Sequence, residues 1–150
     1  MDPFKEKILD YCKSTVRRKI ELISFSLDEI SGSMENETKS SLGDKHETSR
    51  ARMQSEQEKL VWQMDELKGQ YELLRKMDTD RSVETVSNQN LVYTNSGIFF
   101  IVVPIGKIEL EEKVIYVISS NSPIGKKMIG LKAGERFEMN GIHYVIERIL

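Results

Sequence analysis

The sequence predicts an α+β chain in which a long antiparallel hairpin of two helices precedes a small, mostly antiparallel β domain with one short helix. Up to about residue 78, apolar residues recur at steps of three and four, as on one face of a helix. Beyond it, short runs rich in Ile, Val, Phe and Tyr alternate with turn residues. This change of period divides the chain into a hairpin over 1–78 and a β domain over 79–150, with 79–90 as a linker.

The first arm of the hairpin carries the a/d spacing of a coiled-coil seam. The seam positions are Ile8, Cys12, Val16, Ile20, Ile23, Leu27, Ile30 and Met34. Asp2 and Pro3 suit the start of this helix, because Asp can cap it and Pro is tolerated in its first turn. A helix is therefore expected to begin within the first few residues.

The second arm repeats the pattern at Met53, Leu60, Met64, Leu67, Tyr71 and Leu74. Between the arms, segment 35–52 is polar and interrupts the apolar pattern. The interruption predicts a break between the two helices, with a polar tip near 35–50. Two amphipathic helices joined by such a break usually fold back on each other. With arms of about 30 residues, the rod would be roughly 45 Å long.

Five runs after the linker are typical of strands, and a further short strand is expected around 83–86. The runs are "LVYTN", "GIFFIVV", "KVIYVIS", "ERFEM" and "IHYVIERIL". Asn140-Gly141 predicts a tight hairpin turn between the last two, since Asn-Gly accepts the positive φ angles of such turns. Ser122 and Pro123 predict the start of the short helix, as cap and first helical residue.

Composition restricts the function classes. Charged residues make up 31% of the chain, but the net charge is only −2, which argues against a protein that coats nucleic acid by bulk attraction. Cys12 stands alone, so no internal disulfide can form, and a reduced core residue is expected. No signal peptide is apparent, and the longest apolar run contains Pro104 and is too short to cross a bilayer. We expect a soluble, cytoplasmic protein without membrane contact.

The segment "SSNSPIGKKMIGLKAGERFEMNGIHYVIERIL", residues 119–150, resembles the C-terminal end of the bacterial Gre-type transcript cleavage factors, GreA and GreB. That family carries a Ser-Pro-Ile/Leu-Gly/Ala stretch, then a Gly, then a Gly-Asp/Glu pair before a final hairpin. This chain has, in the same order, Ser122-Pro123-Ile124-Gly125, Gly130 and Gly134-Glu135. The resemblance implies an N-terminal antiparallel coiled coil followed by an FKBP-like β domain, and so covers nearly the whole chain.

The family's coiled-coil tip reads Gly-Asp-Leu-x-Glu-Asn-Ala-Glu-Tyr, and residues 43–51 of this chain occupy the same place. Asp44 and Glu47 match the two tip carboxylates that the family requires. Thr48, Arg50 and Ala51 depart from the pattern, and Arg50 puts a cation where the family has a carboxylate.

The resemblance implies a transcription elongation factor that binds bacterial RNA polymerase and inserts its tip into the secondary channel. There Asp44 and Glu47 would share a second Mg²⁺ with the polymerase and orient a water that cleaves backtracked RNA. The factor would therefore be no enzyme by itself and would bind no cofactor alone. Contacts to the RNA 3′ end or the channel would come from Lys39, Lys45, Arg50 and Arg52.

By the same resemblance, the β domain docks on the polymerase through Ser122, Pro123, Ile124 and Gly125, and the factor acts as a monomer. Two other functions stay open. One is a non-cleaving regulator that competes with Gre factors for the channel, and the other is a coiled-coil dimerisation protein without polymerase contact. Asp44 and Glu47 also have the spacing of a capping box, in which Asp44 caps the second helix.

Overall fold

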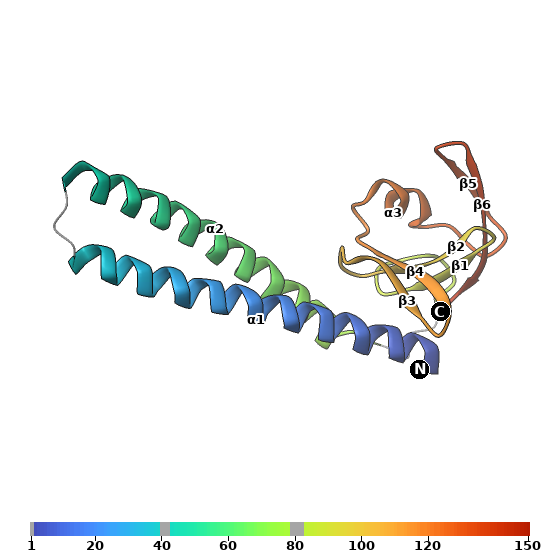
Figure 1. Ribbon diagram of the computed structural model, residues 1–150. Coiled ribbons are helices and arrows are strands. Elements are labelled where there is room, and N and C mark those ends of the chain that lie inside the picture. Colours follow the sequence, from blue (N-terminus) through green and yellow to red (C-terminus); the bar gives the residue numbers. More distant parts are fainter. Residues whose placement is uncertain (1, 40–42, 79–82) are drawn as a thin grey trace. The chain divides into compact units, whose positions relative to one another are not determined.

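The computed structural model describes residues 2–39, 43–78 and 83–150. Within them the chain forms two long helices, four strands, a short helix and two further strands (Figure 1). In order, these are α1 (Pro3–Lys39), α2 (Gly43–Arg75), β1 (Leu91–Thr94), β2 (Gly97–Ile101), β3 (Gly106–Leu110), β4 (Lys113–Ile118), α3 (Pro123–Met128), β5 (Arg136–Met139) and β6 (Ile142–Ile149).

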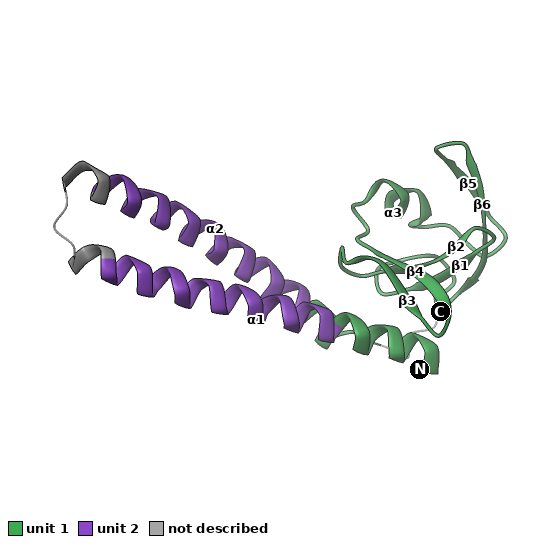
Figure 2. Cartoon of the chain, viewed as in Figure 1, with its two compact units in different colours: residues 1–12, 73–150 green, residues 13–72 purple. Residues whose placement is uncertain are grey.

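The chain divides into two compact units (Figure 2). One unit consists of residues 1–12 and 73–150, and the other of residues 13–72. The domain boundary placed at 78/79 from the sequence lies inside the first unit, because both the start of α1 and the end of α2 belong to it.

The start of α1 follows the sequence prediction. Asp2 Oδ1 accepts hydrogen bonds from the backbone N–H groups of Phe4 and Lys5, each at 3.0 Å, and Pro3 is the first helical residue. Every seam residue predicted for the two arms is buried or half-buried, with Val16 and Leu74 among the fully buried ones. No helix of the described residues has the length and apolar character needed to cross a membrane.

The break between the arms is much shorter than the predicted 35–52. α1 continues to Lys39 and α2 begins at Gly43, while 40–42 lie outside the described residues. Segment 35–52 contains Glu, Lys and Arg, which are good helix formers, and no Pro interrupts it. The loss of apolar periodicity therefore did not mark the end of either helix.

The six strands form one sheet in the order β3-β4-β2-β1-β6-β5. Of its pairings among the described residues, four are antiparallel, and the β2–β4 pairing is parallel. The sheet is therefore mixed, although it is mostly antiparallel as predicted. β3 and β4 form a hairpin that returns the chain to lie parallel to β2.

Two strand predictions need correction. In segment 83–86 only Thr85 makes a β-bridge, to Lys132, so no strand forms there, although Val86 is buried in the core. Strand β3 was missed because its two-residue turn to β4 contains no Gly or Asn. Glu111 and Glu112 adopt positive φ angles of 51° and 63° in that turn, a conformation that such side chains rarely adopt.

One face of the sheet packs against α3 and forms the core that positions the site described below. Met128 from α3 is fully buried among residues of β1, β2 and β6. These residues include Val92, Phe99, Ile101, Tyr144 and Ile146. The register between β1 and β2 places Val92 beside Phe99 on this face. The helix predicted from Ser122-Pro123 thus forms and covers the sheet.

Glu112→Gly should stabilise the protein by about 0.5–1 kcal/mol, because glycine adopts the positive φ of this turn without steric cost. Equilibrium urea unfolding measures the effect. Glu109→Gly is the matched control, since Glu109 is equally exposed but lies in β3 with extended backbone. That change should destabilise the protein instead, so effects of equal sign would contradict the explanation of the turn.

Candidate functional site

An apolar cleft of about 390 Å³ opens on the α3 side of the sheet. It is lined by Ser96, Phe99, Tyr116, Ile118, Ile124, Met139, Asn140, Ile142 and Tyr144. None of these side chains carries a charge. Such a hollow suits an uncharged apolar group, because burying that group removes apolar surface from water on both partners.

Three aromatic rings form the floor of the cleft. The parallel register of β2 and β4 sets Phe99 beside Tyr116, and their rings stack with centroids 5.4 Å apart. Tyr144 of β6 meets Phe99 edge to face at 6.0 Å. These rings come from strands that are separated in sequence, and the pairing of the sheet brings them together.

The first turn of α3 supplies Ile124 to the cleft wall. Ser122 caps this helix with an extended backbone, and its Oγ accepts a hydrogen bond from the Gly125 N–H at 3.1 Å. The same Oγ donates to the Ser119 carbonyl at 2.7 Å. Pro123 occupies the first helical position and is exposed.

The four predicted docking residues therefore have different places. Ile124 lines the cleft, and Pro123 is exposed beside it, whereas Ser122 is a half-buried cap and Gly125 is buried. Sequence reasoning missed the aromatic residues of the floor, Phe99, Tyr116 and Tyr144, which it treated only as strand residues. The three strands that carry these rings were predicted, but no sequence signal indicated which strands would be neighbours.

The predicted tip residues lie at the end of α1 and the start of α2. Glu47, Arg50 and Arg52 are exposed on α2. Asp44 and Lys45 belong to the first turn of α2 and Lys39 ends α1, but the side chains of these three lie outside the described part.

Asp44 and Glu47 stand three residues apart in one helix, so they occupy neighbouring positions on one helix face. α2 begins at Gly43, one residue before Asp44. Asp44 is therefore inside the first turn and not at the cap position that a capping box requires. An acidic residue in this turn is still favoured by the helix dipole.

Among the side chains that the structure describes, no group of three or more His, Cys, Asp and Glu residues could hold a metal ion. The Asp44 side chain lies outside the described part of the chain. This search therefore does not test whether Asp44 and Glu47 share a Mg²⁺ ion.

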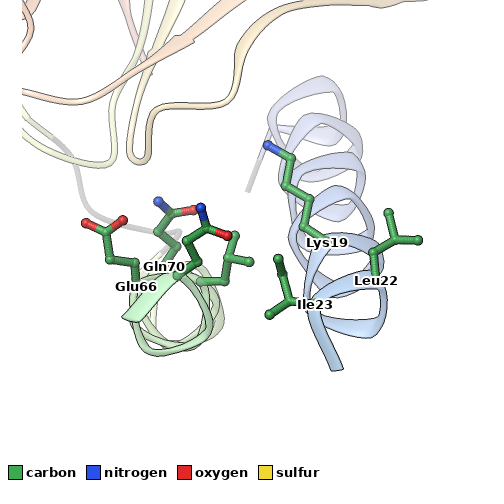
Figure 3. Close-up of a pocket in the computed structure, with 7 residues that line it drawn as sticks. Lys19, Leu22, Ile23, Glu66 and Gln70 are labelled. Carbon is green, nitrogen blue, oxygen red and sulfur yellow. The ribbon is translucent and has the colours of Figure 1, made fainter. Parts of the chain in front are cut away.

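A second hollow, of about 310 Å³, lies between α1 and α2 within residues 13–72 (Figure 3). Leu22, Ile23 and Leu67 give it apolar walls, and Lys19 of α1 and Glu66 of α2 add one charge of each sign. No residue predicted from the sequence to act in docking or cleavage lines this groove.

Arg17 and Tyr71 join the two helices of the same unit. Arg17 Nη2 donates to Tyr71 Oη at 2.5 Å, and the guanidinium carbon lies 5.4 Å from the ring centroid. This polar contact at a seam position was not predicted, because Tyr71 was expected only to pack in the seam.

The chain matches no family model and no curated protein. Two solved structures are similar to it in fold. The transcription factor Gfh1 has a TM-score of 0.37 and 16% identity, over 92% of this chain and 92% of that chain. GreA factor homolog 1 (Gfh1) of Thermus thermophilus has a TM-score of 0.36 and 16% identity, over 92% of this chain and 94% of that chain.

The single cysteine, Cys12, is a free thiol buried in the protein. Burial raises the pKa of the Cys12 thiol from its ordinary value of 9.0 to about 12. The unfolded chain should therefore release this proton first as the pH rises above 9, and native stability should fall between about pH 9 and pH 12.

Comparison with Cys12→Ala isolates this effect from other groups that titrate in the same range. Between pH 8 and pH 10, the wild type should lose about 1 kcal/mol more unfolding free energy than Cys12→Ala. Urea unfolding at both pH values measures the difference. An identical pH dependence of the two proteins would contradict the assignment.

Proposed function

We propose that this chain is a transcription elongation factor that binds bacterial RNA polymerase and stimulates cleavage of backtracked RNA by the polymerase active site. One observation carries the proposal. The Ser-Pro-Ile-Gly stretch of the Gre-like segment presents Ile124 to an uncharged, aromatic-floored cleft. The proposal assigns docking to this cleft, with an apolar side chain of the polymerase as its occupant.

The long helices suit the second part of the proposal, insertion of the hairpin into the secondary channel. α1 has 37 residues and α2 has 33. At 1.5 Å per residue, these helices are roughly 55 and 50 Å long. A pair of helices is slim enough to enter a narrow channel that excludes a globular domain, and this favours a monomer as the acting form.

The chemistry at the tip would need only the carboxylates of Asp44 and Glu47. Carboxylate oxygens are hard ligands suited to Mg²⁺, and in the polymerase active site they would help to hold a second ion. The ion would orient a water for attack on the RNA phosphodiester, which releases the extruded 3′ fragment. The polymerase supplies the remaining ligands, so the factor alone would not cleave RNA.

Basic residues around the tip complete the proposed site. Arg50 and Arg52 are exposed on α2, and Lys39 and Lys45 flank the same part of the sequence. Cations at these positions would attract the phosphates of the extruded RNA or the acidic groups of the channel.

A non-cleaving channel regulator is the second candidate, and Arg50 favours it. Arg50 lies three residues after Glu47 on the same exposed helix, so a guanidinium neighbours one proposed Mg²⁺ ligand. A cation there would weaken the attraction of the tip for a divalent ion. Such a protein would still dock and would compete with cleavage factors.

Asp44→Asn should reduce transcript cleavage on a stalled, backtracked elongation complex by at least about tenfold, because the amide cannot replace a charged Mg²⁺ ligand. The measurement is the rate at which shortened RNA appears, with factor in excess over polymerase. Glu56→Gln is the matched control, since Glu56 is an exposed carboxylate further along α2.

Retention of full cleavage by Asp44→Asn would exclude the metal-positioning role. If neither protein cleaves but both inhibit a known cleavage factor, the regulator is the correct function. If neither cleaves nor competes, the proposal fails in favour of a coiled-coil protein with another partner.

Ile124→Ala should weaken binding to the cognate polymerase by about tenfold, the effect expected when a buried aliphatic anchor is truncated. Ile129→Ala is the control, because Ile129 is exposed next to α3 and does not line the cleft. Fluorescence anisotropy of labelled factor gives both affinities. Equal weakening by the two variants would argue against docking through the cleft.

A further inference from the structure

We propose that Ser122 and Gly125 are positioning residues of the docking cleft, which hold Ile118 and Ile124 in place and do not themselves bind the polymerase. The inference rests on the proposed function, and it assigns separate roles within the four-residue stretch that the resemblance treats as one docking motif.

The Ser122 hydroxyl is already engaged on both sides. It donates to the Ser119 carbonyl at 2.7 Å and accepts from the Gly125 N–H at 3.1 Å. The Ser122 backbone N–H also donates to the Ser119 carbonyl, at 3.1 Å. These bonds close the turn over residues 119–122 onto the first turn of α3, and they leave the hydroxyl no proton for a partner.

Residue 125 must be glycine because the structure leaves no room for a side chain there. A Cβ at this position would lie 2.4 Å from the Ser119 carbonyl oxygen and 2.8 Å from Ser122 Oγ, far inside normal contact. The backbone of Gly125 is helical. Glycine is needed here because a side chain would not fit, and not because the φ angle is unusual. Gly125 is buried and presents no group to an incoming protein.

The turn closed by these contacts joins two parts of the cleft wall. Ile118 ends β4 immediately before the turn, and Ile124 follows immediately after it. Both side chains line the cleft. The backbone at Ile118 is held to the sheet by a hydrogen bond from the Val102 N–H to the Ile118 carbonyl at 2.8 Å, whereas Ile124 lies on the helix that the Ser122 cap begins. Loosening the cap should therefore displace Ile124 relative to Ile118.

The test combines binding with a spectroscopic readout of the cleft. Affinity for the cognate polymerase is measured for wild type, Ser122→Ala, Ser122→Thr and Gly125→Ala. The methyl resonances of Ile118 and Ile124 are recorded by NMR on the same proteins without polymerase. These methyls line a cleft that also contains aromatic rings, so their shifts respond to small displacements. Gly69→Ala is the control, because nothing lies within 4 Å of the added Cβ.

Ser122→Ala should bind about fivefold more weakly, because binding must then restore the order that the N-cap otherwise provides, and should shift the Ile124 resonance. Gly125→Ala should do the same to a greater extent. Ser122→Thr should retain most of the affinity, since Thr keeps a hydroxyl that can both accept from the Gly125 N–H and donate to the Ser119 carbonyl. Gly69→Ala should change neither readout.

Three results would overturn the inference. Weaker binding of Ser122→Ala without a shift of Ile124, and without rescue by Ser122→Thr, would mean that Ser122 contacts the polymerase directly. A shift without any loss of affinity would mean that the position of Ile124 is unimportant for docking. An unshifted Ile124 in both alanine variants would mean that the turn does not hold the wall. Failure of the wild type to bind would refute the proposed function instead, while the resonances would still test the positioning role.

Discussion

The pairing of β1 with β6 is the interaction on which the β domain depends. These strands lie at opposite ends of the domain sequence, and β1 sits between β2 and β6 in the sheet. Leu91 and Leu150 exchange backbone hydrogen bonds of 2.8 and 2.9 Å. Pairing strands so far apart costs loop-closure entropy, which the buried residues on both strands must offset. Without this pairing, Tyr144 and Ile146 would not reach the face that carries Phe99.

The same pairing ties the first turn of α1 to the sheet. Lys5 is buried, and its Nζ donates to the Leu150 carbonyl at 3.1 Å. Burial lowers the pKa of Lys5, and the nearby Asp2 charge opposes that shift. Asp2 also caps α1, so one carboxylate both begins the helix and stabilises the buried ammonium. The start of α1 thus belongs to the same compact unit as the strands.

Docking and chemistry, as proposed, use different physical forces on different parts of the chain. The cleft has no charged lining, so its affinity would come from apolar burial and ring packing. The exposed residues Glu47, Arg50 and Arg52 of α2 offer charge without burial. Charge of this kind contributes little to folding, and it remains available to ions and phosphates. Apolar packing in the seam and the Arg17–Tyr71 contact join the two helices that carry these groups.

The sequence by itself determined the helical seam, the Asp2 and Ser122 caps and the Asn140-Gly141 turn, because each depends on residues close together in the chain. Asn140 and Gly141 both take the positive φ angles that the turn requires. Only the tertiary structure decided the strand order, the parallel β2–β4 pair and the aromatic floor of the cleft. Those features depend on which segments, far apart in the sequence, pair with one another. The local periodicity of the sequence does not encode that pairing. The strained Glu111-Glu112 turn shows the same limit, since the surrounding hairpin overrides the local preference of its residues.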